Sequence, residues 1–77
     1  MIAYHVTSAK KLARYSKAGG IKPPVRAWRD LISAGAFSIQ TGRRLIVRLR
    51  LPDDTPALEG HHGAAVVANS FVRLESM

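Results

Sequence analysis

Hydrophobic and polar residues alternate most regularly over residues 44–51. Every second position is aliphatic, and arginines hold three of the positions between them: Leu45, Val47, Leu49 and Leu51 alternate with Arg44, Arg48 and Arg50. A period of two is that of a β-strand, so the aliphatic side chains share one face and the arginines share the other. Pro52 lacks the amide hydrogen that a sheet ladder needs and ends the strand. We expect this strand to be the central one of a sheet, with its aliphatic face buried.

The first twenty residues predict an edge-like strand followed by a helix. Residues 1–6 alternate, with Tyr4 on one side of the strand and His5 on the other. Thr7 or Ser8 is a suitable N-cap for a helix over residues 9–18, since its hydroxyl accepts from a free first-turn amide. Two glycines at positions 19 and 20 end that helix, because glycine adopts the left-handed conformation that follows a helix C-terminus.

A second helix is predicted after an extended segment. Pro23 and Pro24 keep residues 21–25 out of the helical region. The helix is expected to begin near Trp28 or Arg29, with Asp30 in its first turn, where a carboxylate complements the helix dipole. Its apolar face recurs at helical spacing and consists of Trp28, Leu31, Ile32, Gly35, Ala36 and Ile39.

The C-terminal third is predicted as a loop and two short strands. Prolines and glycines punctuate a loop over residues 53–63. Residues 64–68 form a buried strand, and residues 71–74 form a last strand after a turn at Asn69 and Ser70.

These elements indicate one small α+β domain spanning residues 1–77. We expect a mostly antiparallel sheet with two short helices on one side of it, because sequential strands tend to pair. The expected core consists of Leu45, Val47, Leu49, Leu51, Trp28, Ile32, Val66 and Phe71.

Composition narrows the class of protein. A hydrophobic fraction of 47% and a charged fraction of 22% are typical of a folded domain. The chain has no cysteine, which excludes disulfides and thiolate metal sites and suits a reducing compartment. No apolar run approaches the roughly 18 residues that span a membrane. We therefore expect a cytoplasmic protein without membrane contact.

The charge balance predicts an anionic partner. Twelve Lys and Arg against five Asp and Glu give a net charge of +7. Such a surface favours nucleic acid, a phosphate-bearing cofactor or an acidic protein, although it can also simply keep a small protein in solution. Same-face neighbours on a strand stand about 6.5–7 Å apart, and Arg44 and Arg48 are two such steps apart, so Arg44, Arg48 and Arg50 roughly match the spacing of phosphates along one nucleic-acid strand. A solvated sheet face is the plain alternative.

No complete catalytic or metal motif is present, and the catalytic residues stay unknown. His61 and His62 are adjacent and lack an obvious third ligand, so we expect no metal site there. His5 precedes the hydroxyls of Thr7 and Ser8 at a helix start, where helix amides favour anions. Trp28 is expected in the core, and together with Tyr15 it offers a stacking surface as the alternative.

The opening of the chain resembles that of ADP-ribosyltransferase-like domains. The resemblance rests on the order Tyr4-His5-Val6-Thr7-Ser8, a helix, Gly19-Gly20-Ile21 and a Pro-Val segment, and it covers most of the chain in outline. It implies that His5 hydrogen-bonds a ribose hydroxyl of NAD with Thr7 close by. It also implies that Arg26, Arg43 or Arg44 reaches the diphosphate.

Two functional positions of that family have no clear counterpart. No tyrosine stands on the segment around Trp28, and no glutamate stands near residues 63–66; Glu59 and Glu75 match only in a relaxed alignment. A phosphotransferase relative of the same fold uses histidines and arginines instead, which suits Arg26, Arg43 and Arg44.

Three hypotheses follow from the sequence. The first is a reduced ADP-ribosyltransferase-like domain that binds NAD or a nucleotide phosphate without transferring it. The second is a non-catalytic module that binds nucleic acid through Arg44, Arg48 and Arg50. The third is a small homodimeric interaction module whose basic face meets an acidic protein.

Overall fold

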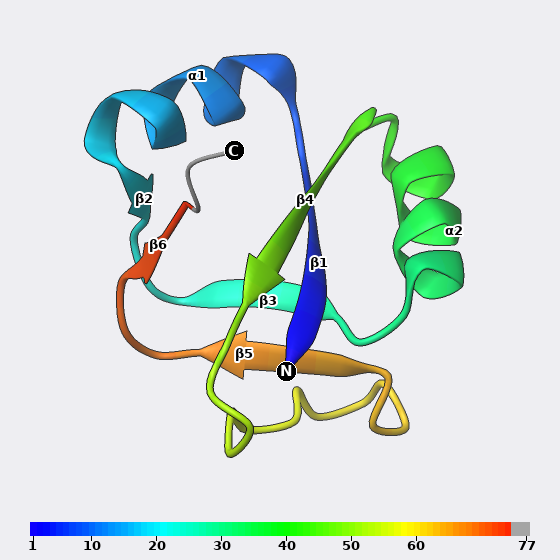
Figure 1. Ribbon diagram of the computed structural model, residues 1–77. Helices are drawn as coiled ribbons and strands as arrows, with labels where there is room; N and C mark the ends of the chain where they lie inside the picture. The colour runs from blue at the N-terminus through cyan, green and yellow to red at the C-terminus, as the bar shows by residue number, and fades with distance from the viewer. Residues whose placement is uncertain (75–77) are drawn as a thin grey trace.

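The chain folds into six strands and two helices over residues 1–74, the part that the computed structural model describes (Figure 1). Their order is β1 (Ile2–Thr7), α1 (Ala9–Ala18), β2 (Gly20–Ile21), β3 (Val25–Trp28), α2 (Leu31–Thr41), β4 (Leu45–Arg50), β5 (Ala65–Ala68) and β6 (Val72–Arg73). A four-stranded sheet has the order β4-β1-β3-β5, and β2 pairs with β6 in a second sheet. Each of these pairings is antiparallel. The predicted α+β class is confirmed.

Strand β1, which the sequence suggested as edge-like, is an inner strand. It pairs with β4 from Ile2 to Thr7 on one side and with β3 on the other. The Leu and Arg strand β4 is therefore an edge strand, and its predicted central place is wrong. An edge suits its composition, because arginines on one face reach water there and discourage pairing with another chain.

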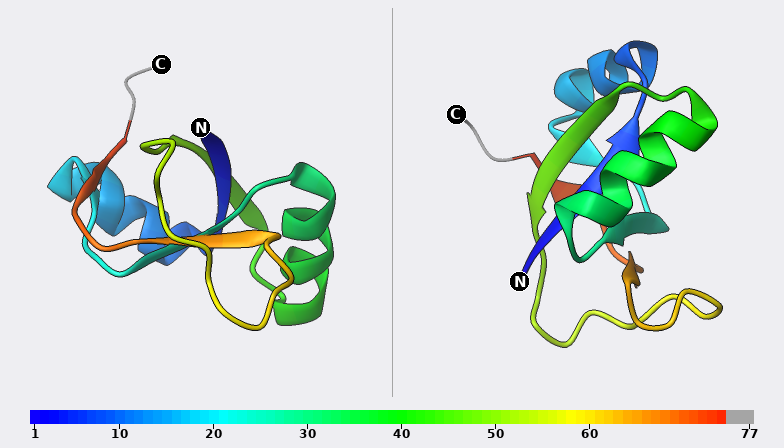
Figure 2. Two further views of the ribbon diagram at one scale, coloured as in Figure 1. Left: turned by 90° about the horizontal axis from the view of Figure 1, so that it is seen from below. Right: turned by 90° about the vertical axis from the view of Figure 1, so that its right-hand side faces the viewer.

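The two helices lie on opposite sides of β1 and β4 (Figures 1 and 2), and the prediction that both lie on one side is wrong. Helix α2 packs against β1, β3 and β4, whereas α1 packs against β2. The reason is that both faces of β1 carry buried side chains, Ala3 on one and Val6 on the other. Each face therefore needs its own cover.

Helix α1 matches its predicted bounds and α2 does not. The Ser8 hydroxyl accepts from the Lys11 amide, and Gly19 ends α1 at a φ of 78°. In α2 the N-cap is Asp30, whose carboxylate accepts from both the amide and the hydroxyl of Ser33, at 2.7 and 2.9 Å. That cap starts the helix at Leu31 and leaves Trp28 as the last residue of β3 rather than on the helix.

The face of α2 that packs on the sheet differs from the predicted one. Ala34 is fully buried and the Phe37 ring lies 5.5 Å from that of Trp28, whereas Ile32 is 86% exposed. The apolar residues of α2 fill two faces, and the face with the small Ala34 packs on the sheet. Burial of Ile32 was a wrong prediction.

The core is built mainly from strands. Leu49, Leu51 and Val66 are buried as predicted, joined by Ala3, Ile21, Val25, Ala27, Ala68 and Val72. Leu45, Val47 and Trp28 are only half-buried, because β4 has a neighbour on one edge and Trp28 faces a cavity. Phe71, predicted in the core, is 45% exposed and stands before β6. Its ring covers Gly20, where a Cβ would come within 2.7 Å of it.

We predict that Leu49→Ala lowers the free energy of unfolding by about 2–5 kcal/mol, because it leaves a cavity in the core. Ile32→Ala, at an exposed position of the same chain, should cost less than about 0.5 kcal/mol. Urea unfolding at low protein concentration measures both. Equal losses at the two positions would contradict the observed orientation of α2.

Candidate functional site

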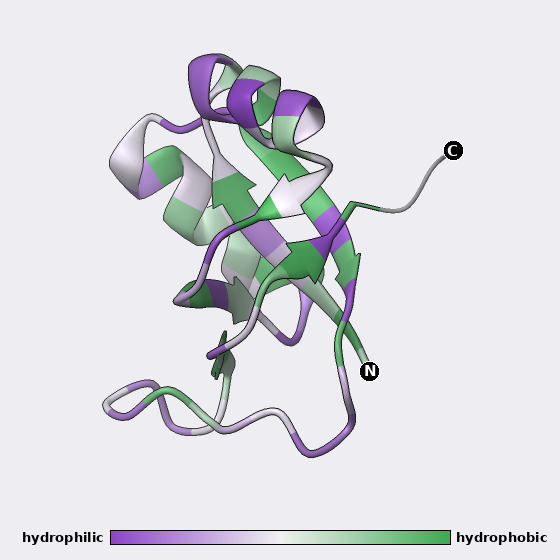
Figure 3. Cartoon of the chain, turned by 90° about the vertical axis from the view of Figure 1, so that its left-hand side faces the viewer, coloured by the Kyte–Doolittle hydropathy of each residue, from purple (hydrophilic) through white to green (hydrophobic). Residues whose placement is uncertain are grey.

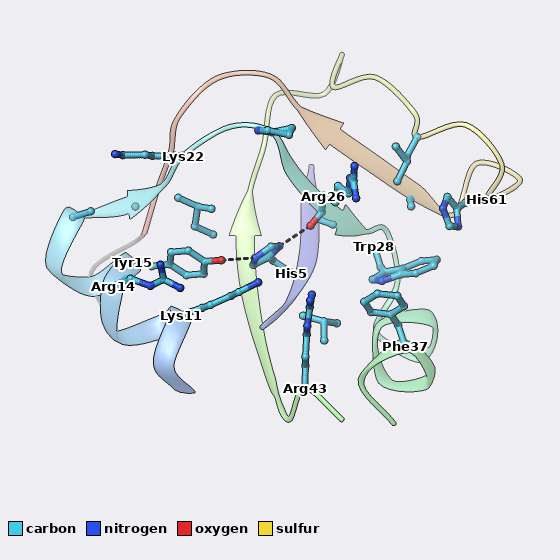
Figure 4. Close-up of a pocket in the computed structure, with 18 of the residues that line it drawn as sticks. His5, Lys11, Arg14, Tyr15, Lys22, Arg26, Trp28, Phe37, Arg43 and His61 are labelled. Atoms are coloured by element: carbon cyan, nitrogen blue, oxygen red, sulfur yellow. Dashed lines mark hydrogen bonds between the residues drawn. The ribbon is translucent and has the colours of Figure 1, made fainter. Parts of the chain in front are cut away.

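His5 lies where β1 and β3 diverge. Among the described residues, the register between these strands consists of Tyr4 opposite Trp28, and beyond that pair β3 runs across β1 (Figure 1). The imidazole occupies the gap. Its Nδ1 lies 2.6 Å from the backbone carbonyl oxygen of Arg26, and its Nε2 lies 3.4 Å from the Tyr15 hydroxyl (Figure 4).

These two contacts decide the tautomer of His5. A backbone carbonyl only accepts, so Nδ1 carries the proton and donates it to Arg26. Nε2 then carries a lone pair, which accepts the weaker hydrogen bond from the Tyr15 hydroxyl. A ligand hydroxyl that displaces the long Tyr15 contact would find a hydrogen-bond acceptor at this point.

The surroundings of His5 keep its ring neutral. Burial lowers the pKa of His5 from its ordinary 6.5, the hydrogen bond to the Arg26 carbonyl raises it, and the charges of Lys11 and Arg43 lower it further. The net effect is to lower the pKa of His5 below 6.5. An imidazole that stays neutral near pH 7 keeps the Nε2 lone pair available.

A cavity of about 1070 Å³ opens beside His5. Six cations line it, half of the twelve in the chain: Lys11, Arg14, Lys17, Lys22, Arg26 and Arg43. None of the described residues that line the cavity is acidic. Positive charge concentrated in a concave site attracts anions.

Helix α1 supplies half of these cations. Lys11, Arg14 and Tyr15 are spaced three and four residues apart, so they share one helix face. In Figure 4 the Lys11 amine extends toward His5, beside the Tyr15 ring. Sequence reasoning did not single out these lysines and arginines, although their helical spacing was a usable signal.

Arg43 is positioned by the C-terminal end of α2. Gly42 ends the helix at a φ of 71°. The Ser38 hydroxyl donates to the carbonyl of Arg43, and the Arg43 amide donates to the Thr41 hydroxyl at 3.4 Å. These bonds hold the backbone of Arg43, whose side chain points into the cavity (Figure 4).

The far end of the cavity is aromatic. The His61 ring meets Trp28 edge-on at 5.3 Å, and Phe37 lies on the other side of Trp28 (Figure 4). His61 belongs to the loop between Gly60 and Gly63, both of which have positive φ. This end offers flat apolar surface, and the end near Tyr15 offers charge. Such a combination suits a ligand with a planar ring and a negatively charged group.

The predicted ligand-binding residues separate into two groups. His5, Arg26 and Arg43 line the cavity, while Thr7 and Arg44 do not. Thr7 is fully buried beside Leu45 of β4, and within the described part of the chain its hydroxyl has no hydrogen-bond partner. Arg44 is exposed just before β4.

The predicted arginine row lies away from His5. Arg48 and Arg50 are exposed and stand opposite Tyr4 and Ile2 in the register, whereas His5 stands opposite Val47. Cross-strand partners share a face, so the two arginines occupy the face of β4 opposite to that of His5.

Three further observations concern the two glutamates, metal binding and the membrane. Glu59 is exposed and does not line the cavity, and Glu75 lies outside the described residues. Within residues 1–74, no group of three His, Cys, Asp or Glu side chains is arranged to hold a metal ion. Neither helix of this part of the chain is long and apolar enough to cross a membrane.

Comparisons of the sequence with family models and with curated proteins, and of the fold with solved structures, gave no match.

We predict that His5 makes stability depend on pH. Its pKa is lower in the folded chain than the 6.5 of the unfolded chain, so below about pH 6.5 the unfolded state binds more protons. Stability should therefore fall as pH drops from 6.5 through the folded pKa, by at most about 1.4 kcal/mol per pH unit. His5→Asn keeps a donor near the Arg26 carbonyl but does not titrate. Urea unfolding between pH 5 and 8 should show the wild type losing stability relative to this variant on the acid side. A constant difference between the two proteins would contradict the lowered pKa.

Proposed function

We propose that this chain is a nucleotide-binding domain that holds NAD, or another nucleotide diphosphate, in the cavity beside His5 without transferring it. The observation that carries the proposal is that six cations and no carboxylate line this cavity among the described residues. A diphosphate is a compact anion that Arg and Lys bind through charge-assisted hydrogen bonds. The cavity is also larger than a single phosphate requires.

His5 and the aromatic residues account for the rest of such a ligand. A ribose hydroxyl would take the place of the Tyr15 hydroxyl and donate to the Nε2 lone pair of His5. Trp28, beside Phe37 and His61, gives a planar base an apolar surface. This division of roles agrees with what the resemblance to ADP-ribosyltransferase-like domains implies for His5, Arg26 and Arg43.

The absence of transfer is proposed from the charge of the cavity. Cleavage at the ribose develops positive charge on the sugar, which glycoside-cleaving enzymes stabilise with a carboxylate. The described wall of this cavity offers cations instead, and these oppose that charge. The domain would therefore retain its ligand intact.

We predict that NAD binds with a Kd in the micromolar to millimolar range and that Arg43→Gln weakens binding about tenfold, the loss of one charge-assisted contact. Arg48→Gln is the matched control, because it removes the same charge from the other face of the sheet. Calorimetric titration measures both. Because an anion offsets the charges of Lys11 and Arg43, bound NAD should also raise the pKa of His5, visible by NMR.

Three outcomes would contradict this proposal. No heat at millimolar NAD and ADP would exclude nucleotide binding. An equal loss in Arg43→Gln and Arg48→Gln would place binding outside the cavity. An ADP-ribosyl adduct, found by mass spectrometry after incubation with NAD, protein and nucleic acid, would show transfer chemistry, with Glu59 and Glu75 as the first positions to substitute.

A second candidate function is nucleic-acid binding along β4. Arg44, Arg48 and Arg50 are all exposed, and the outer edge of β4 carries no neighbouring strand among the described residues. Arg48 and Arg50 share one face of this edge strand and Arg44 stands just before it, so a phosphate backbone could follow all three. Phosphate contacts of this kind do not select sequence.

For this candidate we predict that log K for an oligonucleotide falls by about 0.7–0.9 per phosphate contact for each unit of log salt. Arg48→Ala should flatten that slope and weaken all sequences alike, while Arg43→Gln should leave it unchanged. Fluorescence anisotropy with single- and double-stranded oligonucleotides measures the slopes. No binding at low salt would exclude the candidate and would leave an acidic protein as the partner of these arginines.

A further inference from the structure

Helix α2 presents an apolar face to solvent. Leu31, Ile32 and Ile39 are 56%, 86% and 87% exposed, and they are three of the five large hydrophobic residues that the described chain exposes. On a helix with 3.6 residues per turn, Leu31, Gly35 and Ile39 form one row and Ile32 and Ala36 the next. The two rows make one stripe, which we call the outer face of α2. It points away from Ala34 and Phe37, the residues that face the sheet.

The centre of the outer face is shallow. A Cβ built on Gly35 would have no atom within 4 Å, so nothing in the chain covers this position. The larger Leu31 and Ile39 stand one turn before it and one turn after it. The face is therefore symmetric about its middle, with a low centre and a large aliphatic residue toward each end.

The outer face of α2 differs from the rest of the molecule in that its helix carries no charged residue. Residues 31–41 contain no Asp, Glu, Lys, Arg or His, in a chain of net charge +7. Four cations lie on α1, which is on the opposite side of β1 and β4 (Figure 1) and carries the hydrophilic bands in Figure 3. Two copies that meet through α2 would thus keep their most basic helices far apart.

The charges at the two ends of α2 favour one relative orientation of two α2 helices that pack together. Arg29 and the exposed Asp30 stand together at the N-terminal end, and the exposed Arg44 follows the C-terminal end. A parallel arrangement would bring the Arg44 ends of two copies together. An antiparallel arrangement sets Arg44 of one copy near Asp30 of its partner and opposes the two helix dipoles.

We propose that the outer face of α2 is a homodimer interface in which two copies pack antiparallel about a two-fold axis at Gly35 and Ala36. Leu31 of one copy packs near Ile39 of the partner, and the low centre lets the two helices approach closely. One helix face is small beside the roughly 1,200–2,000 Å² of a stable complex. The dimer is therefore weak and depends on concentration. Salt strengthens it, because screening reduces the repulsion between two basic chains.

Sedimentation equilibrium tests the dimer. We expect a monomer–dimer equilibrium with a Kd on the order of 10–1000 μM, tighter at 0.5 M salt than at 0.05 M. Ile39→Lys should abolish it. Because the Ile39 side chain is exposed, the variant should keep the wild-type circular dichroism spectrum and unfolding midpoint at low concentration. Wild type that stays monomeric at 1 mM in high salt would overturn the proposal and leave this face to a different protein. A dimer that Ile39→Lys does not weaken would also overturn it.

Single cysteines test the orientation, because the native chain has none. Under mild oxidation Ala36→Cys should cross-link with itself faster than Ser16→Cys, an exposed control on α1. A mixture of Leu31→Cys and Ile39→Cys should give mixed dimers in preference to dimers of either variant alone. Preferential self-linking of Leu31→Cys would mean a parallel pair and would overturn the antiparallel arrangement. None of these readouts depends on nucleotide, so the test is independent of the function proposed for the cavity.

Discussion

The hydrogen bond from His5 to the carbonyl of Arg26 joins two strands where their own ladder has ended. The imidazole spans the gap between β1 and β3 and so ties the two inner strands of the sheet together. The same bond assigns the proton to Nδ1 and leaves Nε2 as an acceptor. One side chain thus serves both the pairing of the strands and the chemistry of the cavity beside it.

Positive charge reaches that cavity from several separate segments. Helix α1, β3 and the turn before β4 each contribute, and β1 holds His5 between them. Like charges gathered in one concave site repel each other, and the downward effect of Lys11 and Arg43 on the pKa of His5 expresses that repulsion. An anion that binds there relieves it and stabilises the folded chain by mass action. The uncharged outer face of α2 points away from Phe37, which lines the cavity, so the molecule separates a polar site from an apolar one.

Local patterns were sufficient where local chemistry decides the structure. The bounds of helix α1 agree with the prediction because a hydroxyl cap and a following glycine act within one turn of the helix. The two faces of β4 followed from its period of two. The predicted face of α2 was wrong because its apolar residues fill two stripes, and periodicity cannot tell which one a sheet will cover. Trp28 was misplaced because Asp30 is an equally good cap or first-turn residue, and only the bonds to Ser33 decide between them.

The sequence by itself determined the α+β class, the two helices and the alternation of β4. It offered five candidates for a common site, of which His5, Arg26 and Arg43 line the cavity. The tertiary structure alone decided that β1 is internal and β4 an edge, that Thr7 and Arg44 do not line the cavity, and that Lys11, Arg14, Lys17 and Lys22 do. The physical reason is the separation along the chain over which each kind of interaction acts. Caps and periodicity act over a few residues, whereas strand order and the meeting of α1 with β3 depend on contacts between segments distant in the chain. A cavity consists only of such contacts, so no local pattern contains its full set of residues.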